Sequence, residues 1–151
     1  MSTRIVTLIA FFVLCVGGGS LVGLQNLPGA WYDGLVKPIF NPPNWIFGPV
    51  WTLLYAMIAI AGWRTWMRAS DSGLMILWFA QLALNLTWSP VFFTYNWMLI
   101  AALIIVAMVV LTIAFIVNSW NVDKVAAVLM LPYLAWISFA TMLNISLWWL
   151  N

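Results

Sequence analysis

The sequence of 151 residues has very few charged residues and no histidine at all. Only 5% of the residues are charged and 66% are hydrophobic, whereas a soluble domain has about 25% charged residues and is about half apolar. So few ionic groups cannot cover a water-facing surface. They exclude intrinsic disorder, nucleic-acid binding and ordinary soluble catalysis. The composition is that of an integral membrane protein.

Residues that bind metals or perform acid–base chemistry are equally scarce. With no histidine, one cysteine and three carboxylates, the chain has no ligand set for a metal, and we predict neither a metal site nor a cofactor. It also lacks the partners that a Ser-His-Asp or Cys-His nucleophile needs. Cys15 has no second cysteine with which to form a disulfide, so we expect it to be a buried apolar residue.

Five apolar stretches are long enough to cross a bilayer as helices, for which about 20 residues are needed. They cover residues 5–24, 45–66, 74–93, 97–117 and 124–149. The first stretch is too long for a signal peptide and has no convincing cleavage site, so we interpret it as a retained helix. We therefore predict an all-α integral membrane protein with a single domain over residues 1–151. It is a bundle of five transmembrane helices with a long structured first loop.

The basic residues are distributed unequally between the two sides of the predicted bundle. Arg4, Arg64, Arg68 and Lys124 fall on one side, and only Lys37 falls on the other. Cytoplasmic loops are enriched in Lys and Arg, so this asymmetry predicts a cytoplasmic N-terminus. Five scattered basic residues are too few for a nucleic-acid site or a polybasic lipid patch.

The predicted spans are rich in aromatic residues and have no ionised side chain in their middle, which argues against a proton-coupled transporter. Seven of the twelve tryptophans fit the aromatic belts at the membrane interfaces. They are Trp45, Trp63, Trp66, Trp97, Trp120, Trp148 and Trp149. Trp51, Trp88 and Trp136 lie further inside, where a buried indole needs an acceptor for its N–H.

The third span carries two amides on one helix face. Gln81, Asn85, Trp88 and Phe92 are spaced by four, three and four residues, so they share that face. Amides inside a membrane must be hydrogen-bonded away from lipid. The partner is either another helix or a ligand, and both interpretations stay open here.

Two other spans carry similar stripes of aromatic or amide residues. The stripes are Tyr133, Trp136, Ala140 and Asn144 on the fifth span and Trp51, Tyr55 and Ile58 on the second. Three such faces are enough to line one pocket. A pocket of this kind suits a flat, mostly apolar ligand with a few polar edges.

The polar interval between the first two spans, residues 25–44, contains the dense pattern WYDGLVKPIFNPP. Asp33 and Lys37 are four residues apart, which predicts an ion pair on a short helix that ends before Pro38. An ordered loop of about 20 residues at a membrane surface is typical of a lid.

Three segments carry a resemblance to a known family. They are WYDGLVKPIFNPPNWIFGPVW (residues 31–51), QLALNLTWSPVFF (81–93) and LPYLAWISFATMLN (131–144). They resemble the first loop with the second helix, the third helix and the fifth helix of the TspO/translocator protein family. Its members are also called tryptophan-rich sensory proteins or peripheral-type benzodiazepine receptors. The length and the five spans agree with this family.

The resemblance implies a five-helix bundle, usually a homodimer, with a ligand cavity beneath the first loop. Family ligands include porphyrins such as protoporphyrin IX, haem and synthetic benzodiazepine-type compounds. The implied function is that of a membrane receptor or carrier for porphyrins, with a role in tetrapyrrole transport, sensing or stress response. Two alternatives stay open. One is light- and oxygen-dependent porphyrin degradation, for which the chain offers no general base or metal. The other is a regulatory interaction with other membrane proteins.

The resemblance also assigns roles to single residues. Trp51 and Trp136 match the two cavity tryptophans that are linked to porphyrin binding and breakdown, so they are the reactive pair if the protein is photochemical. Asn85 and Trp88 match the wall of the cavity on the third helix, and Tyr32 lies in the loop that closes it.

Ala140 matches a fifth-helix position where a small side chain affects ligand binding. The predicted ligand-binding set combines these positions with the stripes, and we predict no other catalytic residue. The set is Tyr32, Trp51, Tyr55, Gln81, Asn85, Trp88, Phe92, Trp136 and Ala140.

One departure from the family pattern concerns sterols. Eukaryotic members follow the fifth-helix Leu-Asn pair with an aromatic and then a basic residue. Here Asn144 is followed by ISLWW, which contains no Tyr, Lys or Arg. We therefore do not predict specific cholesterol binding. The missing motif and the short tail favour a bacterial cell membrane.

Overall fold

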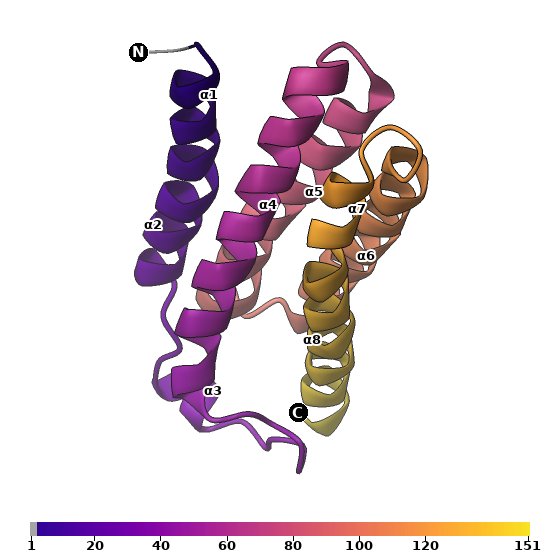
Figure 1. Cartoon of the computed structure of the whole chain (residues 1–151). Helices are drawn as coiled ribbons and strands as arrows, with labels where there is room; N and C mark the ends of the chain where they lie inside the picture. Colours follow the sequence, from indigo (N-terminus) through magenta and orange to yellow (C-terminus); the bar gives the residue numbers. More distant parts are fainter. Residues whose placement is uncertain (1–2) are drawn as a thin grey trace.

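The computed structural model describes residues 3–151. Within that part of the chain, five helical segments are long and apolar enough to cross a membrane, and they form an up-and-down bundle (Figure 1). They run over Thr3–Gln25, Asn44–Ala69, Gly73–Thr94, Met98–Ser119 and Lys124–Leu150. The all-α membrane fold with five spans is confirmed, and every predicted boundary lies within three residues of the observed one.

The first and third spans each contain a π-helical turn. The first consists of α1 (Thr3–Phe12), η1 (Val13–Gly17) and α2 (Gly18–Gln25), and the third consists of α5 (Gly73–Ser89) and η3 (Pro90–Thr94). The turn at η3 begins at Pro90, which has no N–H to continue the α-helical bonding pattern. Cys15, inside η1, is fully buried, as expected.

The second and fifth spans are also composite. The second begins with a 3-10 turn, η2 (Asn44–Ile46), and continues as α4 (Phe47–Ala69). The fifth divides into α7 (Lys124–Leu129) and α8 (Leu131–Leu150). The division falls just before Pro132, because this residue cannot donate to the carbonyl one turn earlier.

The fourth span, α6 (Met98–Ser119), packs between α5 and α8, while α1 packs against α4. Two glycines allow rings to lie directly against a helix backbone. A Cβ added at Gly19 would overlap the ring of Tyr55, and one added at Gly62 would overlap the ring of Trp78. Close packing at these points fixes how α2 and α5 sit on α4.

The first loop is ordered and covers one end of the bundle (Figure 1). It contains the short helix α3 (Ala30–Asp33), in which Tyr32 is buried. The predicted ion pair between Asp33 and Lys37 is wrong. Because α3 ends before Lys37, the Nζ of Lys37 donates instead to the backbone carbonyls of Tyr32 and Asp33, at 2.7 and 3.1 Å. It also lies 4.8 Å from the centre of the Tyr32 ring.

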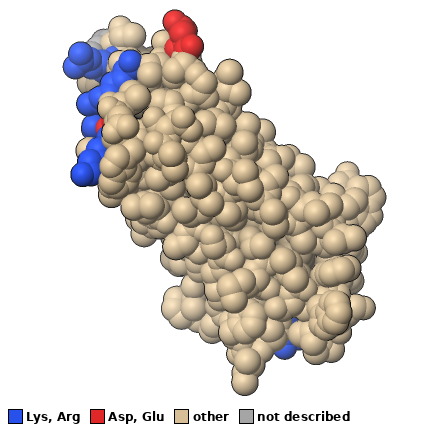
Figure 2. Space-filling view, turned by 90° about the vertical axis from the view of Figure 1, so that its right-hand side faces the viewer, with Lys and Arg blue, Asp and Glu red and all other residues tan. Residues whose placement is uncertain are grey.

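Charged side chains lie at the ends of the bundle. On the face drawn in Figure 2, basic residues gather at one end and a wide uncharged band separates them from the other end. The basic end is where α1 begins and α4 ends, so it contains Arg4, Arg64 and Arg68, whereas Lys37 lies in the first loop at the opposite end. This arrangement fits a multi-pass membrane protein.

Candidate ligand-binding site

A chain of hydrogen bonds joins the second, third and fifth spans. The hydroxyl of Tyr55 on α4 donates to Oδ1 of Asn85 on α5 at 2.6 Å. The Nδ2 of Asn85 donates in turn to the hydroxyl of Tyr133 on α8 at 3.1 Å. Asn85 and Tyr133 are buried. The amide is therefore bonded to other helices, which is one of the two interpretations that its sequence position left open.

Trp51 and Trp136 lie beside this chain of bonds. Their ring centres are 6.5 Å apart and their planes are perpendicular, at 90°. The Trp51 ring also lies 5.4 Å from the ring of Tyr55 and 6.4 Å from that of Tyr133. The contacts of Trp51 with Tyr133 and Trp136 are edge-to-face, and contacts of this kind stabilise aromatic clusters. The stripes on the second, third and fifth spans thus face one another.

The indole of Trp136 has an unusual environment. Its N–H is buried and has no acceptor within residues 3–151. The nearest aromatic neighbours besides Trp51 are Phe47 and Phe139, whose ring centres lie 5.9 and 5.7 Å away. A buried donor without an acceptor costs about 1–3 kcal/mol. Such a group requires an explanation, and a ligand atom that accepts the bond would provide one.

A second aromatic group lies nearer the first loop. Trp88 and Phe92 are stacked, with ring centres 5.2 Å apart and an interplanar angle of 16°. The ring of Tyr32 lies 6.3 Å from that of Phe92. The N–H of Trp88 donates to Oδ1 of Asn144 at 3.1 Å, and Asn144 donates to the carbonyl of Met98 at 2.9 Å. The rings of Tyr32, Trp88 and Phe92 therefore form one continuous aromatic group next to the first loop.

Two side-chain contacts hold the first loop in place. The hydroxyl of Tyr32 donates to Oδ1 of Asn41 at 3.1 Å. The amide of Asn151 accepts from the N–H of Val36 at 2.9 Å and donates to its carbonyl at 3.0 Å. Burial raises the pKa of Tyr32, the Asp33 carboxylate adds to this, and the bond to Asn41 opposes it. The phenol therefore stays protonated and keeps its bond at neutral pH.

Two predicted residues take less part in this arrangement. Gln81 is fully buried, but its Nε2 donates to the carbonyl of Trp78 on its own helix at 2.9 Å. Its side-chain oxygen has no partner in the described part of the chain. Ala140 is half-buried and packs against the same aromatic core as Trp51. Gln81 thus shares a helix face with Asn85 without joining its hydrogen bonds.

Three residues outside the predicted set hold polar positions in the core. Tyr133 and Asn144 complete the two hydrogen-bond chains from the fifth span. Both stood in the fifth-span stripe, but spacing within one helix does not show which residue on another helix it meets. Trp78 is fully buried, and its N–H donates to the carbonyl of Ile58 at 3.0 Å. No sequence signal marked Trp78, which lies about one turn from the start of the predicted third span.

Two cavities open at opposite ends of the bundle. The first, of about 510 Å³, is lined by Arg4, Trp63, Arg64, Met67 and Arg68. The second, of about 390 Å³, is lined by Asn96, Trp97, Met98, Leu99, Ile100, Trp148 and Asn151. None of the nine predicted ligand-binding residues lines either of these cavities. The rings of Trp51 and Trp136 contact one another, so a ligand between them has to separate the two rings.

Comparison with known proteins shows which family the chain belongs to. Residues 11–150 match the model of the TspO/MBR family. The chain belongs to the TspO/MBR family. The resemblance carried by the first loop and by the third and fifth helices is therefore confirmed, and the chain is a multi-pass membrane protein of this family.

TspO/MBR relatives occur in several groups of organisms. The chain is 42% identical over 142 residues to the tryptophan-rich protein TspO of Archaeoglobus fulgidus, covering 92% of each protein. It is 36% identical over 145 residues to protein CrtK of Rhodobacter capsulatus, covering 93% of this chain and 90% of the relative. It is 35% identical over 149 residues to the human translocator protein, covering 91% of this chain and 86% of the relative.

Proposed function

We propose that this TspO/MBR protein is a membrane receptor or carrier that binds a porphyrin, such as protoporphyrin IX or haem, or a similar flat apolar ligand. The ligand lies between the second, third and fifth spans. The observation that carries the proposal is the buried N–H of Trp136, which has no acceptor within residues 3–151. It lies beside Trp51, whose ring is perpendicular to that of Trp136. Two indoles and one available donor match a flat ring with a polar edge.

A ligand that binds at this position replaces the contact between the rings of Trp51 and Trp136. A flat ligand inserted between Trp51 and Trp136 exchanges one ring–ring contact for stacking on the ligand. Asn85 is already bonded to Tyr55 and Tyr133, so it ties the second, third and fifth spans together beside the site. The first loop then covers the site through Tyr32, which lies against Phe92.

The test is a titration of protoporphyrin IX into the purified protein in detergent, in the dark, following the porphyrin absorption band. Trp136→Phe keeps an aromatic ring but removes the N–H, so we expect saturable one-site binding that weakens about fivefold to tenfold. Trp149→Phe is the matched control, because Trp149 is 80% exposed. Unsaturable binding, or equal weakening by both substitutions, would contradict the proposal.

A second candidate, light-dependent breakdown of the bound porphyrin, is favoured by the contact between Trp51 and Trp136, which places two oxidisable indoles together. Illumination of the complex distinguishes the two functions. Loss of the absorption band over repeated additions of porphyrin indicates turnover. A single loss accompanied by a modified tryptophan indicates a receptor that is damaged once. The double substitution Trp51→Phe with Trp136→Phe is expected to abolish either change.

We also propose a homodimer in a bacterial cell membrane with a cytoplasmic N-terminus, on the basis of the family resemblance and the basic end of the bundle. Cysteine labelling in intact cells tests the orientation, because Cys15 is buried and does not react. A cysteine at Ile39→Cys in the first loop is expected to react with a membrane-impermeant maleimide. Asp71→Cys at the other end is expected to be protected, and the reverse pattern would refute the orientation.

A further inference from the structure

The cavity at the basic end brings together arginines from two spans. Arg4 comes from α1, and Arg64 and Arg68 come from α4. Trp63 and Met67 complete the lining, and the volume of about 510 Å³ is that of a typical small-ligand site. The residues that line it lie where α1 begins and α4 ends, and Figure 1 shows these helix ends at the opposite end of the bundle from the first loop. The cavity is therefore separate from the proposed porphyrin site.

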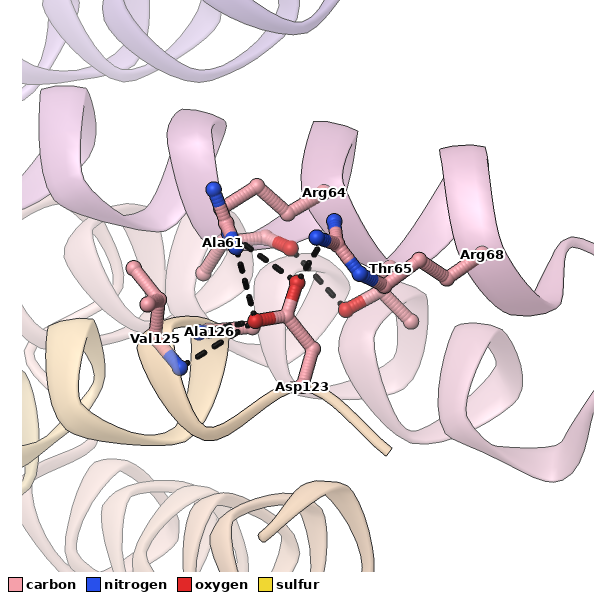
Figure 3. A network of polar contacts seen from close by, with 7 residues as sticks. All are labelled: Ala61, Arg64, Thr65, Arg68, Asp123, Val125 and Ala126. Carbon is pink, nitrogen blue, oxygen red and sulfur yellow. Dashed lines mark hydrogen bonds and ion pairs between the residues drawn. The ribbon is translucent and has the colours of Figure 1, made fainter. Parts of the chain in front are cut away.

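A buried carboxylate orients two of these arginines (Figure 3). The side chain of Asp123 is only 4% exposed. It accepts from Nε and Nη2 of Arg64 at 2.9 and 3.0 Å, and from Nη1 of Arg68 at 3.0 Å. The backbone N–H groups of Val125 and Ala126 donate to it at 3.1 and 3.3 Å. This set of contacts fixes both guanidinium groups before any ligand binds.

The Asp123 carboxylate is ionised in this setting. Burial alone would raise its pKa. The hydrogen bonds from Arg64 and Ala126, with the charges of Arg64 and Arg68, outweigh burial and lower the pKa below its usual value. Its single negative charge faces three guanidinium groups, because Arg4 lines the same cavity and forms no ion pair in the described part of the chain. The cluster therefore keeps a net positive charge.

Donors for an anion remain on all three arginines. A guanidinium has five N–H donors in a fixed fork. Arg64 uses two of them on Asp123 and Arg68 uses one. The planar fork of arginine matches the oxygens of a phosphate, and the contact with Asp123 reduces the entropy lost when an anion binds.

We propose that this cavity binds the phosphate group of an anionic phospholipid. The apolar side chains of Trp63 and Met67 beside the arginines favour a lipid over a soluble anion, because they give the first part of the acyl chains a surface to contact. The position of the cavity, where α1 begins and α4 ends at the membrane surface, also favours a lipid, since basic pockets between spans bind lipid headgroups. The N–H of Trp63 donates to the backbone carbonyl of Arg4 at 3.2 Å, which holds the two walls together.

The first test uses native mass spectrometry of the purified protein in detergent with either dioleoylphosphatidylglycerol or dioleoylphosphatidylcholine. We expect one phosphatidylglycerol molecule to be retained in preference to phosphatidylcholine. Arg4→Gln is the main variant, because Arg4 does not contact Asp123 and its removal leaves the ion-pair cluster intact. It should weaken retention about fivefold, and a second change, Arg68→Gln, should weaken it by a similar factor again.

The matched control is Lys124→Gln, which removes one positive charge from the same end of the bundle. Lys124 lies over the ring of Trp120, at 5.2 Å, and does not line the cavity. Equal retention of the two lipids, or an equal effect of Arg4→Gln and Lys124→Gln, would overturn the proposal. Excess inorganic phosphate that displaces the lipid completely would also overturn it, because the site would then be one for a soluble anion.

Discussion

The hydroxyl of Tyr55 donates a short hydrogen bond of 2.6 Å to the side-chain oxygen of Asn85, which lies on the next span. Because Asn85 also donates to Tyr133, a single amide links three spans. The ring of Tyr55 is the surface against which Gly19 of the first span packs. Four of the five spans therefore meet around this one tyrosine.

Removal of the hydroxyl in Tyr55→Phe should destabilise the protein. The substitution leaves the Asn85 oxygen buried without a donor, which costs about 1–3 kcal/mol. We expect the thermal midpoint in detergent to fall by several degrees. Tyr95→Phe is the control, because Tyr95 is 57% exposed and should leave the midpoint unchanged. A Tyr55→Phe protein as stable as the wild type would mean that water or a lipid replaces the donor.

A methyl group added at Gly19 should disturb the same contact from the other side. In Gly19→Ala the new Cβ overlaps the Tyr55 ring, and overpacking of this kind costs about 1–3 kcal/mol. Gly23→Ala is matched to it, four residues along the same helix, where a Cβ meets no atom within 4 Å. Thermal unfolding should show a loss for the first change. The second should be neutral or slightly stabilising, because alanine favours helix. Equal effects would contradict the packing argument.

Asp123→Asn should remove a pH-dependent part of the stability. The pKa of Asp123 is lowered in the folded protein. Its contribution is therefore present above the ordinary carboxyl pKa of about 3.9 and is lost as the pH falls through the lower folded value. At neutral pH the variant should be less stable by about 1–3 kcal/mol, while asparagine can still cap α7.

The measurement is the thermal midpoint of both proteins at several pH values from neutral down to about pH 2, across the window in which the contribution is lost. The difference between wild type and Asp123→Asn should shrink as the solution becomes more acidic. Asp71→Asn, at an exposed carboxylate, should follow the wild type throughout. A constant difference at all pH values would show that the charge of Asp123 is not the cause.

Asn151→Ala should loosen the first loop. The side chain of Asn151 makes two hydrogen bonds to the backbone of Val36, so its removal frees both groups. Amide hydrogen exchange at Val36 should become faster by at least about fivefold, as expected for the loss of about 1 kcal/mol of local protection. Asn121→Ala, in an exposed turn at the other end, should leave exchange in the first loop unchanged. Unchanged exchange at Val36 in Asn151→Ala would mean that other contacts hold the loop.

The spans could be predicted from the sequence because bilayer thickness imposes a length that a run of apolar residues shows directly. The stripes were also visible, because residues three and four apart share a helix face. Trp51 and Asn85 were marked in this way, and the structure places them on facing helices.

Contacts between helices could not be predicted in the same way. Asp33 and Lys37 have the spacing of a helical ion pair, but the short helix ends before Lys37. The Nζ of Lys37 therefore donates to backbone carbonyls instead. The meeting of Arg4 and Arg64 at one cavity could be predicted only with knowledge of which helices are neighbours. The same holds for the pairing of Asn85 with Tyr133, since the spacing along one helix carries no information about the rotation of another.

All eight charged side chains lie in loops or within two turns of an end of a span, and the face drawn in Figure 2 shows the uncharged band between the two ends. A membrane potential acts only on charge that moves through the field, at about 2.3 kcal/mol per elementary charge for 100 mV. Movements of the aromatic rings inside the uncharged band therefore carry no charge through the field. If an anionic ligand crosses by this route, the voltage dependence of its flux measures the charge of the ligand alone.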